Sequence, residues 1–333
     1  MGELDHWQPV RTSRELGRRP LGVRLAGQEL VLFRTGDGAI GALRDVCPHR
    51  GMRLSLGTVQ GERLVCPYHG WRFTAAGDGE SPGTPKLYAC AEAFAALERH
   101  GAIWVKSRHA TARFPRLEPA GYFPVRVLRH TVRAPLEVVL DNFTEVEHTG
   151  TTHLFLGYPT ERLAEVETRV ETTEDSVRVI NRGPQRWLPA PLERLFQIRT
   201  GDVFTDAWTT CFSPVYTEYD QWWADPRTGA PRPYRIKVFV FFTPRDGEST
   251  ELVSLLYTSA PRWGRLGLNR LLEPLLVLLV DLEVRLDRRM VENLADKRPS
   301  LRGRRLGRFD KALGENRRRL ARIYYGCEEQ AVL

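Results

Sequence analysis

Two short stretches near the start of the chain combine cysteine and histidine in the same order. Cys47-Pro-His49 and, sixteen residues later, Cys66-Pro-Tyr-His69 each carry one thiol and one imidazole. Two thiolates and two imidazoles are the ligand set of a 2Fe–2S centre in which one iron takes both sulfurs and the other takes both nitrogens. A structural zinc ion is the alternative, because Cys2His2 sets also suit tetrahedral zinc. Zinc fingers usually place both cysteines in one knuckle, so the alternating order favours the iron–sulfur centre.

A second group of potential metal ligands follows in the segment 141–153. His148 and His153 stand five residues apart, and this spacing alone is a weak signal, since two unrelated surface histidines would give it too. The upstream centre favours a metal, because an electron donor needs an acceptor. A carboxylate would complete a 2-His-1-carboxylate triad, which leaves iron coordination positions open for dioxygen and substrate.

Three acidic residues in the last long apolar segment are candidates for this carboxylate. Asp287, within Leu286-Asp-Arg-Arg-Met-Val-Glu292, is the preferred candidate, and Asp281 and Glu283 compete with it. Glu283 lies four residues before Asp287 and therefore shares its helical face. A carboxylate on an amphipathic helix is most often only solvated, so the pattern by itself leaves the alternatives open.

The length and composition indicate two soluble domains. The chain has 333 residues, of which 42% are hydrophobic and 27% charged. Its net charge of +8 comes from arginines spread along the chain, without a recognised nucleic-acid-binding motif. We therefore expect no nucleic-acid partner, and a basic patch that docks an acidic redox partner is the favoured explanation.

The cysteines and the apolar segments point to a cytoplasmic protein. Two of the five cysteines are candidate ligands, and Cys90, Cys211 and Cys327 are scattered, so no disulfide framework is expected. The first residues lack the pattern of a signal peptide. The most apolar tract, 271–284, is interrupted by charged residues and proline and is shorter than the ~20 residues that span a bilayer, so no membrane segment is expected.

The pattern of strands and helices predicts an all-β first domain, residues 1–114, and an α+β second domain, residues 115–333. Short β-rich runs and Gly-Asp-Gly turns fill the first, with the ligand loops at hairpin tips and 101–105 as the closing strand. In the second we expect an antiparallel sheet covered by helices, of the helix-grip type, with helices over about 135–147, 266–295 and 311–324. The run 239–242 is assigned to the sheet core. The pair Trp222 and Trp223 is assigned to a loop over a pocket, or else to hairpin or subunit contacts.

Nearly end to end, the chain resembles the oxygenase component of the Rieske non-haem iron oxygenases. The resemblance rests on six stretches: His6–Val10, Leu30–Arg34, Cys47–Gly51, Cys66–Trp71, Asn142–His153 and Asp287–Glu292. In that family the motif Asn-Phe-x-acid-x-x-His-x4-His supplies two iron ligands, and an aspartate followed five residues on by glutamate supplies the third. This implies iron ligands at His148, His153 and Asp287. The length is most similar to the short branch with vanillate and dicamba O-demethylases, whose members form homotrimers.

The resemblance also implies roles for Glu145 and Asn142. Relatives nearly always have aspartate at the position of Glu145, where it bridges a cluster histidine of one subunit and an iron-ligating histidine of the next. Glutamate is one methylene longer, so either the neighbouring subunit lies slightly farther away or Glu145 folds back and the contact differs. Such a carboxylate orients the imidazole and raises its basicity. Three residues before His148 on a helix, Glu145 is expected to bond this ring with one oxygen and to keep the other free for the neighbouring subunit. Asn142 is expected beside the iron as a hydrogen-bonding group.

A terminal oxygenase is the function that the resemblance implies. Each chain would hold one 2Fe–2S cluster and one mononuclear Fe(II), and would hydroxylate or oxidatively demethylate a small organic substrate. No glycine fingerprint for a nucleotide occurs, so electrons from NAD(P)H must come through a separate ferredoxin or reductase. A cis-dihydroxylating dioxygenase is one alternative. A pure electron-transfer protein is another, and it would need only the first domain.

Overall fold

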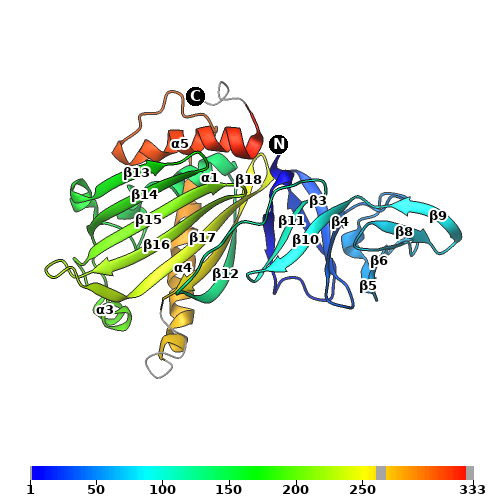
Figure 1. The fold of residues 1–333 in the computed structure, drawn as a ribbon, viewed down its shortest axis with the longest axis horizontal. Helices are drawn as coiled ribbons and strands as arrows, with labels where there is room; N and C mark the ends of the chain where they lie inside the picture. Colours follow the sequence, from blue (N-terminus) through cyan, green and yellow to red (C-terminus); the bar gives the residue numbers. More distant parts are fainter. Residues whose placement is uncertain (1, 260–267, 328–333) are drawn as a thin grey trace.

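Three antiparallel sheets form the framework of the fold (Figure 1), and the computed structural model describes residues 2–259 and 268–327. The six-stranded sheet has the order β1-β11-β10-β4-β3-β2. Its strands are β1 (Gln8–Thr12), β2 (Leu21–Leu25), β3 (Gln28–Arg34), β4 (Ile40–Arg44), β10 (Ala93–Arg99) and β11 (Ala102–Ser107). The five-stranded sheet, inserted between β4 and β10, runs β5 (Thr58–Gln60), β6 (Arg63–Val65), β7 (Arg72–Phe73), β8 (Asp78–Ser81) and β9 (Thr84–Cys90).

The seven-stranded sheet and all the α-helices lie in the second part of the chain. The strand order is β12-β18-β17-β16-β15-β14-β13. These strands are β12 (Phe123–Val132), β13 (Glu167–Thr172), β14 (Ser176–Pro184), β15 (Val203–Phe212), β16 (Val215–Ala224), β17 (Pro231–Asp246) and β18 (Ser249–Thr258). The helices are α1 (Leu136–Asn142), α2 (Thr149–Thr152), α3 (Ala190–Phe196), α4 (Leu268–Glu292) and α5 (Lys311–Arg319), which continues into the π-helical turn η6 (Leu320–Tyr325). The expected all-β and α+β architecture is confirmed.

Both faces of the large sheet are buried, and the side chains of each strand alternate between the two faces. Val240 and Phe242 of β17 pack in the same core as Val280 and Val284 of α4, which crosses one face of the sheet (Figure 1). Phe239 and Phe241 point the other way and share a core with Trp104 of β11 and with Trp7, which directly precedes β1. The aromatic run 239–242 is therefore sheet core, as the sequence predicted.

The helical predictions are right in kind but not in extent. The first predicted helix, 135–147, ends at Asn142, because the hydroxyl of Thr144 donates to the carbonyl of Leu140 (2.8 Å) and the chain then turns. Of the helix expected over 266–295, residues 268–292 are helical and residues 266 and 267 lie outside the described part of the chain. No helix among the described residues is long and apolar enough to span a membrane.

Candidate metal centres

The two Cys–His knuckles have the same backbone geometry. The amide of Cys47 donates to the carbonyl of Met52 (2.8 Å), and the amide of Gly51 donates to the carbonyl of Cys47 (2.9 Å). The second knuckle repeats this, with Cys66 bonding Trp71 (2.7 Å) and Gly70 bonding Cys66 (3.1 Å). Both glycines have a left-handed backbone, with φ of +74° and +69°, a conformation that glycine adopts without strain. The two Cys–His motifs therefore form two loops with the same backbone hydrogen bonds.

These loops bring the four predicted ligands together in like pairs. The thiols of Cys47 and Cys66 are buried and are hydrogen-bond neighbours, whereas the rings of His49 and His69 are exposed, with centroids 4.5 Å apart. Burial raises the pKa of the Cys47 thiol to about 11, and the neighbouring sulfur of Cys66 contributes to the rise. Two adjacent thiolates in this position need a cationic partner. The donor set fits a cluster with sulfurs on the inner iron and imidazoles on the outer one.

The Cys66 knuckle joins β6 to β7, which are paired, so it sits at a hairpin tip as expected. The Cys47 knuckle follows β4 and leads into the five-stranded sheet, so it connects two sheets instead of closing one hairpin. The ring of Trp71 stacks on His49, with centroids 4.7 Å apart and planes 5° from parallel. This contact holds the exposed imidazole in place.

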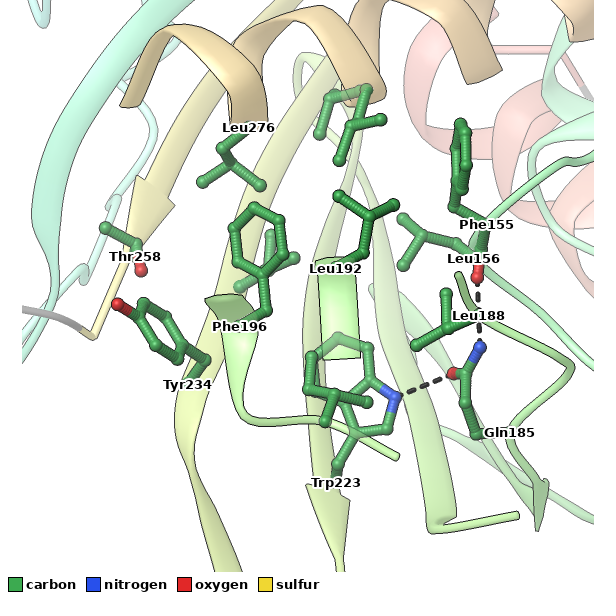
Figure 2. A pocket seen from close by; sticks show the side chains of 14 residues that line it. Phe155, Leu156, Gln185, Leu188, Leu192, Phe196, Trp223, Tyr234, Thr258 and Leu276 are labelled. Atoms are coloured by element: carbon green, nitrogen blue, oxygen red, sulfur yellow. Dashed lines mark hydrogen bonds between the residues drawn. The ribbon is translucent and has the colours of Figure 1, made fainter. Parts of the chain in front are cut away.

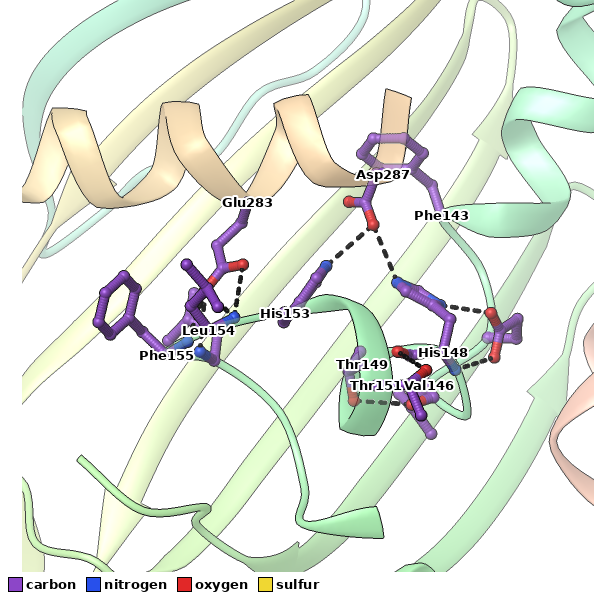
Figure 3. Close-up of polar contacts among 12 residues, drawn as sticks. Phe143, Val146, His148, Thr149, Thr151, His153, Leu154, Phe155, Glu283 and Asp287 are labelled. Carbon is purple, nitrogen blue, oxygen red and sulfur yellow. Dashed lines mark hydrogen bonds and ion pairs between the residues drawn. The ribbon is translucent and has the colours of Figure 1, made fainter. Parts of the chain in front are cut away.

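A second set of ligands converges where α2 meets α4 (Figure 3). His148 and His153 cap the two ends of the single-turn α2, and Asp287 comes from α4. One carboxylate oxygen, Oδ1 of Asp287, lies 3.1 Å from Nε2 of His148 and 2.9 Å from Nε2 of His153. One donor atom from each residue lies within 4.8 Å of the others. Three buried or half-buried donors of this type fit an octahedral metal with open positions.

The charges in this set also suit a divalent cation. Burial disfavours the charged form of His148, but hydrogen bonds to Asp287 and Glu145 outweigh it and raise the pKa of this ring to about 10. Burial alone would raise the pKa of Asp287, yet the two histidines hold it well below its usual range. The chain without a metal therefore needs a proton between these groups, and a bound cation would displace that proton.

Glu283 and Arg186 fix the backbone around His153, a role that the sequence did not predict for either residue. The carboxylate of Glu283 is 4% exposed and accepts hydrogen bonds from the amides of residues 154, 155 and 156, the shortest being 2.7 Å from Phe155 (Figure 3). The guanidinium of Arg186 donates to the carbonyls of Thr149 (2.9 Å) and His153. The position of the imidazole thus depends on a carboxylate on one side and a guanidinium on the other.

The structure distinguishes the three candidate carboxylates by their contacts. Glu283 shares a face of α4 with Asp287, as predicted, but is occupied by the backbone amides. Asp281 faces β12, where Oδ1 lies 2.8 Å from Nε2 of His130, and its other oxygen pairs with Arg285 (2.8 Å). Glu292, the last residue of the Asp287 motif, bonds Arg133 and Arg288. Asp287 is the carboxylate that the structure brings to both histidines.

Glu145 contacts His148 as expected, but through a turn and not along a helix. Its Oε1 accepts from Nδ1 of His148, while Oε2 accepts from the amides of Glu147 (2.5 Å) and His148 (3.3 Å). The expectation that this second oxygen is free is wrong, because the chain turns after Asn142 and the carboxylate caps the exposed amides of that turn. A carboxylate has about four acceptor sites in all, and the three hydrogen bonds above use three of them, so one acceptor site of Glu145 remains.

The triad opens into a cavity with further polar groups. Its lining includes Asn142 and also Asp206, Trp208, Tyr219 and Gln221, which come from strands β15 and β16 and were not predicted. Within residues 2–259 and 268–327, Nδ2 of Asn142 and Nε1 of Trp208 are buried donors without a partner. Burial raises the pKa of Asp206 to about 6, although Gln221 donates a hydrogen bond to it (3.0 Å). Asn142 therefore lies at the site where it was expected.

Comparison with known proteins identifies the first domain and the fold. Residues 6–93 match the Rieske [2Fe-2S] domain. The structure of dicamba monooxygenase bound to 3,6-dichlorosalicylic acid superposes with a TM-score of 0.77 over 96% of each chain, at 18% identity. Residues 6–93 therefore form a Rieske-type domain, and the chain as a whole has the fold of dicamba monooxygenase.

Two curated relatives are similar to part of this chain. Methylxanthine N1-demethylase NdmA of Pseudomonas putida is 34% identical over 163 residues, which are 44% of this chain and 46% of NdmA. The vanillate O-demethylase oxygenase subunit of a Pseudomonas species is 31% identical over 207 residues, 57% of this chain and 61% of the relative. The chain thus spans about half of NdmA and three fifths of the vanillate enzyme, and the likeness does not carry their substrates over.

Proposed function

We propose that this chain is a terminal oxygenase that inserts oxygen into a small organic molecule with electrons from an external ferredoxin or reductase. The observation that carries the proposal is the convergence of His148, His153 and Asp287, with donor atoms within 4.8 Å of one another, in a chain whose other domain is of the Rieske type. A pure electron carrier would have no use for this second set of ligands.

In this proposal Cys47, Cys66, His49 and His69 hold the 2Fe–2S cluster, and the triad holds a mononuclear Fe(II). When bound, the Fe(II) supplies open coordination positions for dioxygen and substrate. Residues of the chain would balance the metal charge and hold the ligands in place. Asp287 neutralises part of the metal charge, Glu283 and Arg186 fix the backbone beside His153, and Glu145 orients the ring of His148 through Nδ1.

The distance between the two centres in one chain supports a homotrimer in which neighbours exchange electrons. The knuckles adjoin the five-stranded sheet, at the end of the molecule remote from α4, and the six-stranded sheet lies between them (Figure 1). A cluster supplied by an adjacent subunit would shorten this path. Glu145 is half-buried, contacts a triad histidine and also lines a surface groove with residues 294–306, so it is placed to face such a neighbour.

Metal analysis and isotope labelling test the proposal. Protein purified without air should contain about two irons and two acid-labile sulfides in the cluster, plus about one further iron, and Asp287→Ala should lose only the last. With a surrogate reductase and ¹⁸O₂, one labelled oxygen in the product indicates a monooxygenase or demethylase, and two indicate a dihydroxylating dioxygenase. Stoichiometric zinc without labile sulfide would contradict the proposal, as would an Asp287→Ala protein that keeps its third iron.

A further inference from the structure

An apolar chamber adjoins the cavity of the candidate iron site. It lies between α3, α4 and the strands β16, β17 and β18 (Figure 2). The cavity volume is about 50 Å³ in the chamber and about 100 Å³ in the adjoining iron-site cavity. Leu156 and Val280 line both spaces, so a molecule in the chamber would have one end near the triad. The apolar lining and the position beside the candidate metal ligands are typical of a small-molecule site.

The polar groups of the chamber are already bonded within the chain. Gln185 is 1% exposed; its amide nitrogen donates to the carbonyl of Phe155 (2.9 Å), and its oxygen accepts from the indole N–H of Trp223 (2.7 Å), as Figure 2 shows. The hydroxyl of Thr258 donates to the carbonyl of Arg235 (3.3 Å). Tyr234 also has a partner, and its ring packs edge-on against another aromatic side chain of the chamber wall. A ligand would therefore meet mainly hydrocarbon.

Charge in and around the chamber disfavours ionised ligands. None of the fourteen described residues that line it is acidic or basic. The adjoining iron-site cavity has four carboxylates, from Glu145, Asp206, Glu283 and Asp287, and no lysine or arginine among its described lining. An organic acid in the chamber would lose its hydration and would meet no lysine or arginine, and an ammonium group there would find no carboxylate.

We propose that this chamber binds the body of an uncharged, predominantly apolar substrate and discriminates against organic acids and organic cations. The inference rests on the proposed oxygenase function, because it names the substrate class of that same site. It sets this chain apart from dicamba monooxygenase, whose structure holds 3,6-dichlorosalicylic acid.

Three probes of the same shape test the inference: 2-methylnaphthalene, 2-naphthoate and 2-naphthylmethylammonium. Equilibrium dialysis of the metal-loaded protein without oxygen or reductant, read by naphthalene fluorescence, gives the three dissociation constants. We expect 2-methylnaphthalene to bind at least tenfold more tightly than either charged probe. Equal or tighter binding of a charged probe overturns the inference, and so does a failure of 2-methylnaphthalene to bind.

A variant that adds a cation checks that the probes occupy the chamber. Leu192 of α3 points into it (Figure 2) and is half-buried, so the longer arginine can be accommodated. Leu192→Arg should shift the preference at least tenfold towards 2-naphthoate, and the matched Leu192→Met should keep the wild-type order. An unchanged preference in Leu192→Arg would place the probes elsewhere and overturn the inference. Because no turnover is involved, absence of any oxygenated product would contradict the proposed function alone.

Discussion

Replacing Glu283 with alanine should release the backbone that follows His153 and should leave the carboxylate facing both histidines in place. Glu283 accepts from three consecutive amides, at 3.1 Å from Leu154, 2.7 Å from Phe155 and 3.3 Å from Leu156. Its side chain is almost fully buried, so bulk water does not replace it freely. Asp287, one turn further along α4, makes no such backbone contacts among the described residues.

The size of the effect follows from the number of donors left without an acceptor. A buried N–H without a partner costs about 1–3 kcal/mol, and three of them would cost ~3–9 kcal/mol. A water molecule that enters the vacated space recovers part of this. We therefore expect Glu283→Ala to lower the free energy of unfolding of the metal-free protein by about 3 kcal/mol or more. Glu283→Gln, which keeps one acceptor oxygen, should lose less.

Two measurements on the metal-free protein follow the change. Hydrogen–deuterium exchange should show faster exchange of the amides of residues 154–156 in Glu283→Ala than in Glu283→Gln. Urea unfolding gives the loss of stability. Asp287→Ala serves as the comparison, because it should abolish binding of the third iron while leaving these amides protected.

The opposite pattern in the two variants would contradict these assignments. If Glu283→Ala kept wild-type amide protection and stability but lost the iron, and Asp287→Ala retained the iron, Glu283 would be the ligand. Loss of protection in both variants would mean that the two carboxylates act as one unit.

Three further predictions concern other parts of the chain. Glu145→Gln should keep both metals but almost abolish turnover, which single-turnover mixing would show as slow oxidation of the cluster. Glu145→Asp should retain part of the turnover. Normal rates in Glu145→Gln would mean that this carboxylate is only structural. Burial lowers the pKa of His6 from 6.5, so the unfolded chain binds the proton more readily, and stability should fall by at most about 1.4 kcal/mol per pH unit as the pH drops below 6.5. His6→Gln should weaken this dependence in urea titrations, and an unchanged slope would count against it. Trp223→Phe should leave the buried oxygen of Gln185 unpaired and lower stability by about 1–3 kcal/mol; an unchanged urea midpoint would mean that water replaces the lost N–H.

Local motifs predicted which candidate metal ligands lie together, because these ligands stand in short stretches of sequence. The knuckles at Cys47 and Cys66 need only a few residues to form, and His148 and His153 are joined by a single helical turn. The choice among acidic residues on α4 was not accessible in the same way. It depends on which groups face each carboxylate, and those groups lie more than 100 positions away, as Phe155 does from Glu283.

The walls of the cavities were not predictable because they depend on strand register. Trp222 and Trp223 are adjacent and look alike in sequence, but alternation in β16 sends them to opposite faces. Trp223 is 1% exposed and lines the chamber, whereas Trp222 lies 5.2 Å from the guanidinium of Arg235. The expected loop over a pocket is therefore a strand that forms the pocket wall. Neither β16 nor β15, which carries Asp206 and Trp208, was predicted as a strand.

The core shared by the six-stranded and seven-stranded sheets determines how electrons can be supplied. Trp104 is fully buried and meets Phe241 edge-on at 4.8 Å, and Trp7 and Phe239 belong to the same core. A hinge motion of the cluster domain would expose these rings to water, at about 25 cal/mol for each Å² of apolar surface. In the proposed oxygenase the cluster would therefore keep a fixed place on its own chain and would not travel to the iron. If electrons pass between copies, as we propose, the activity per chain should fall when the protein is diluted below the concentration at which its subunits associate.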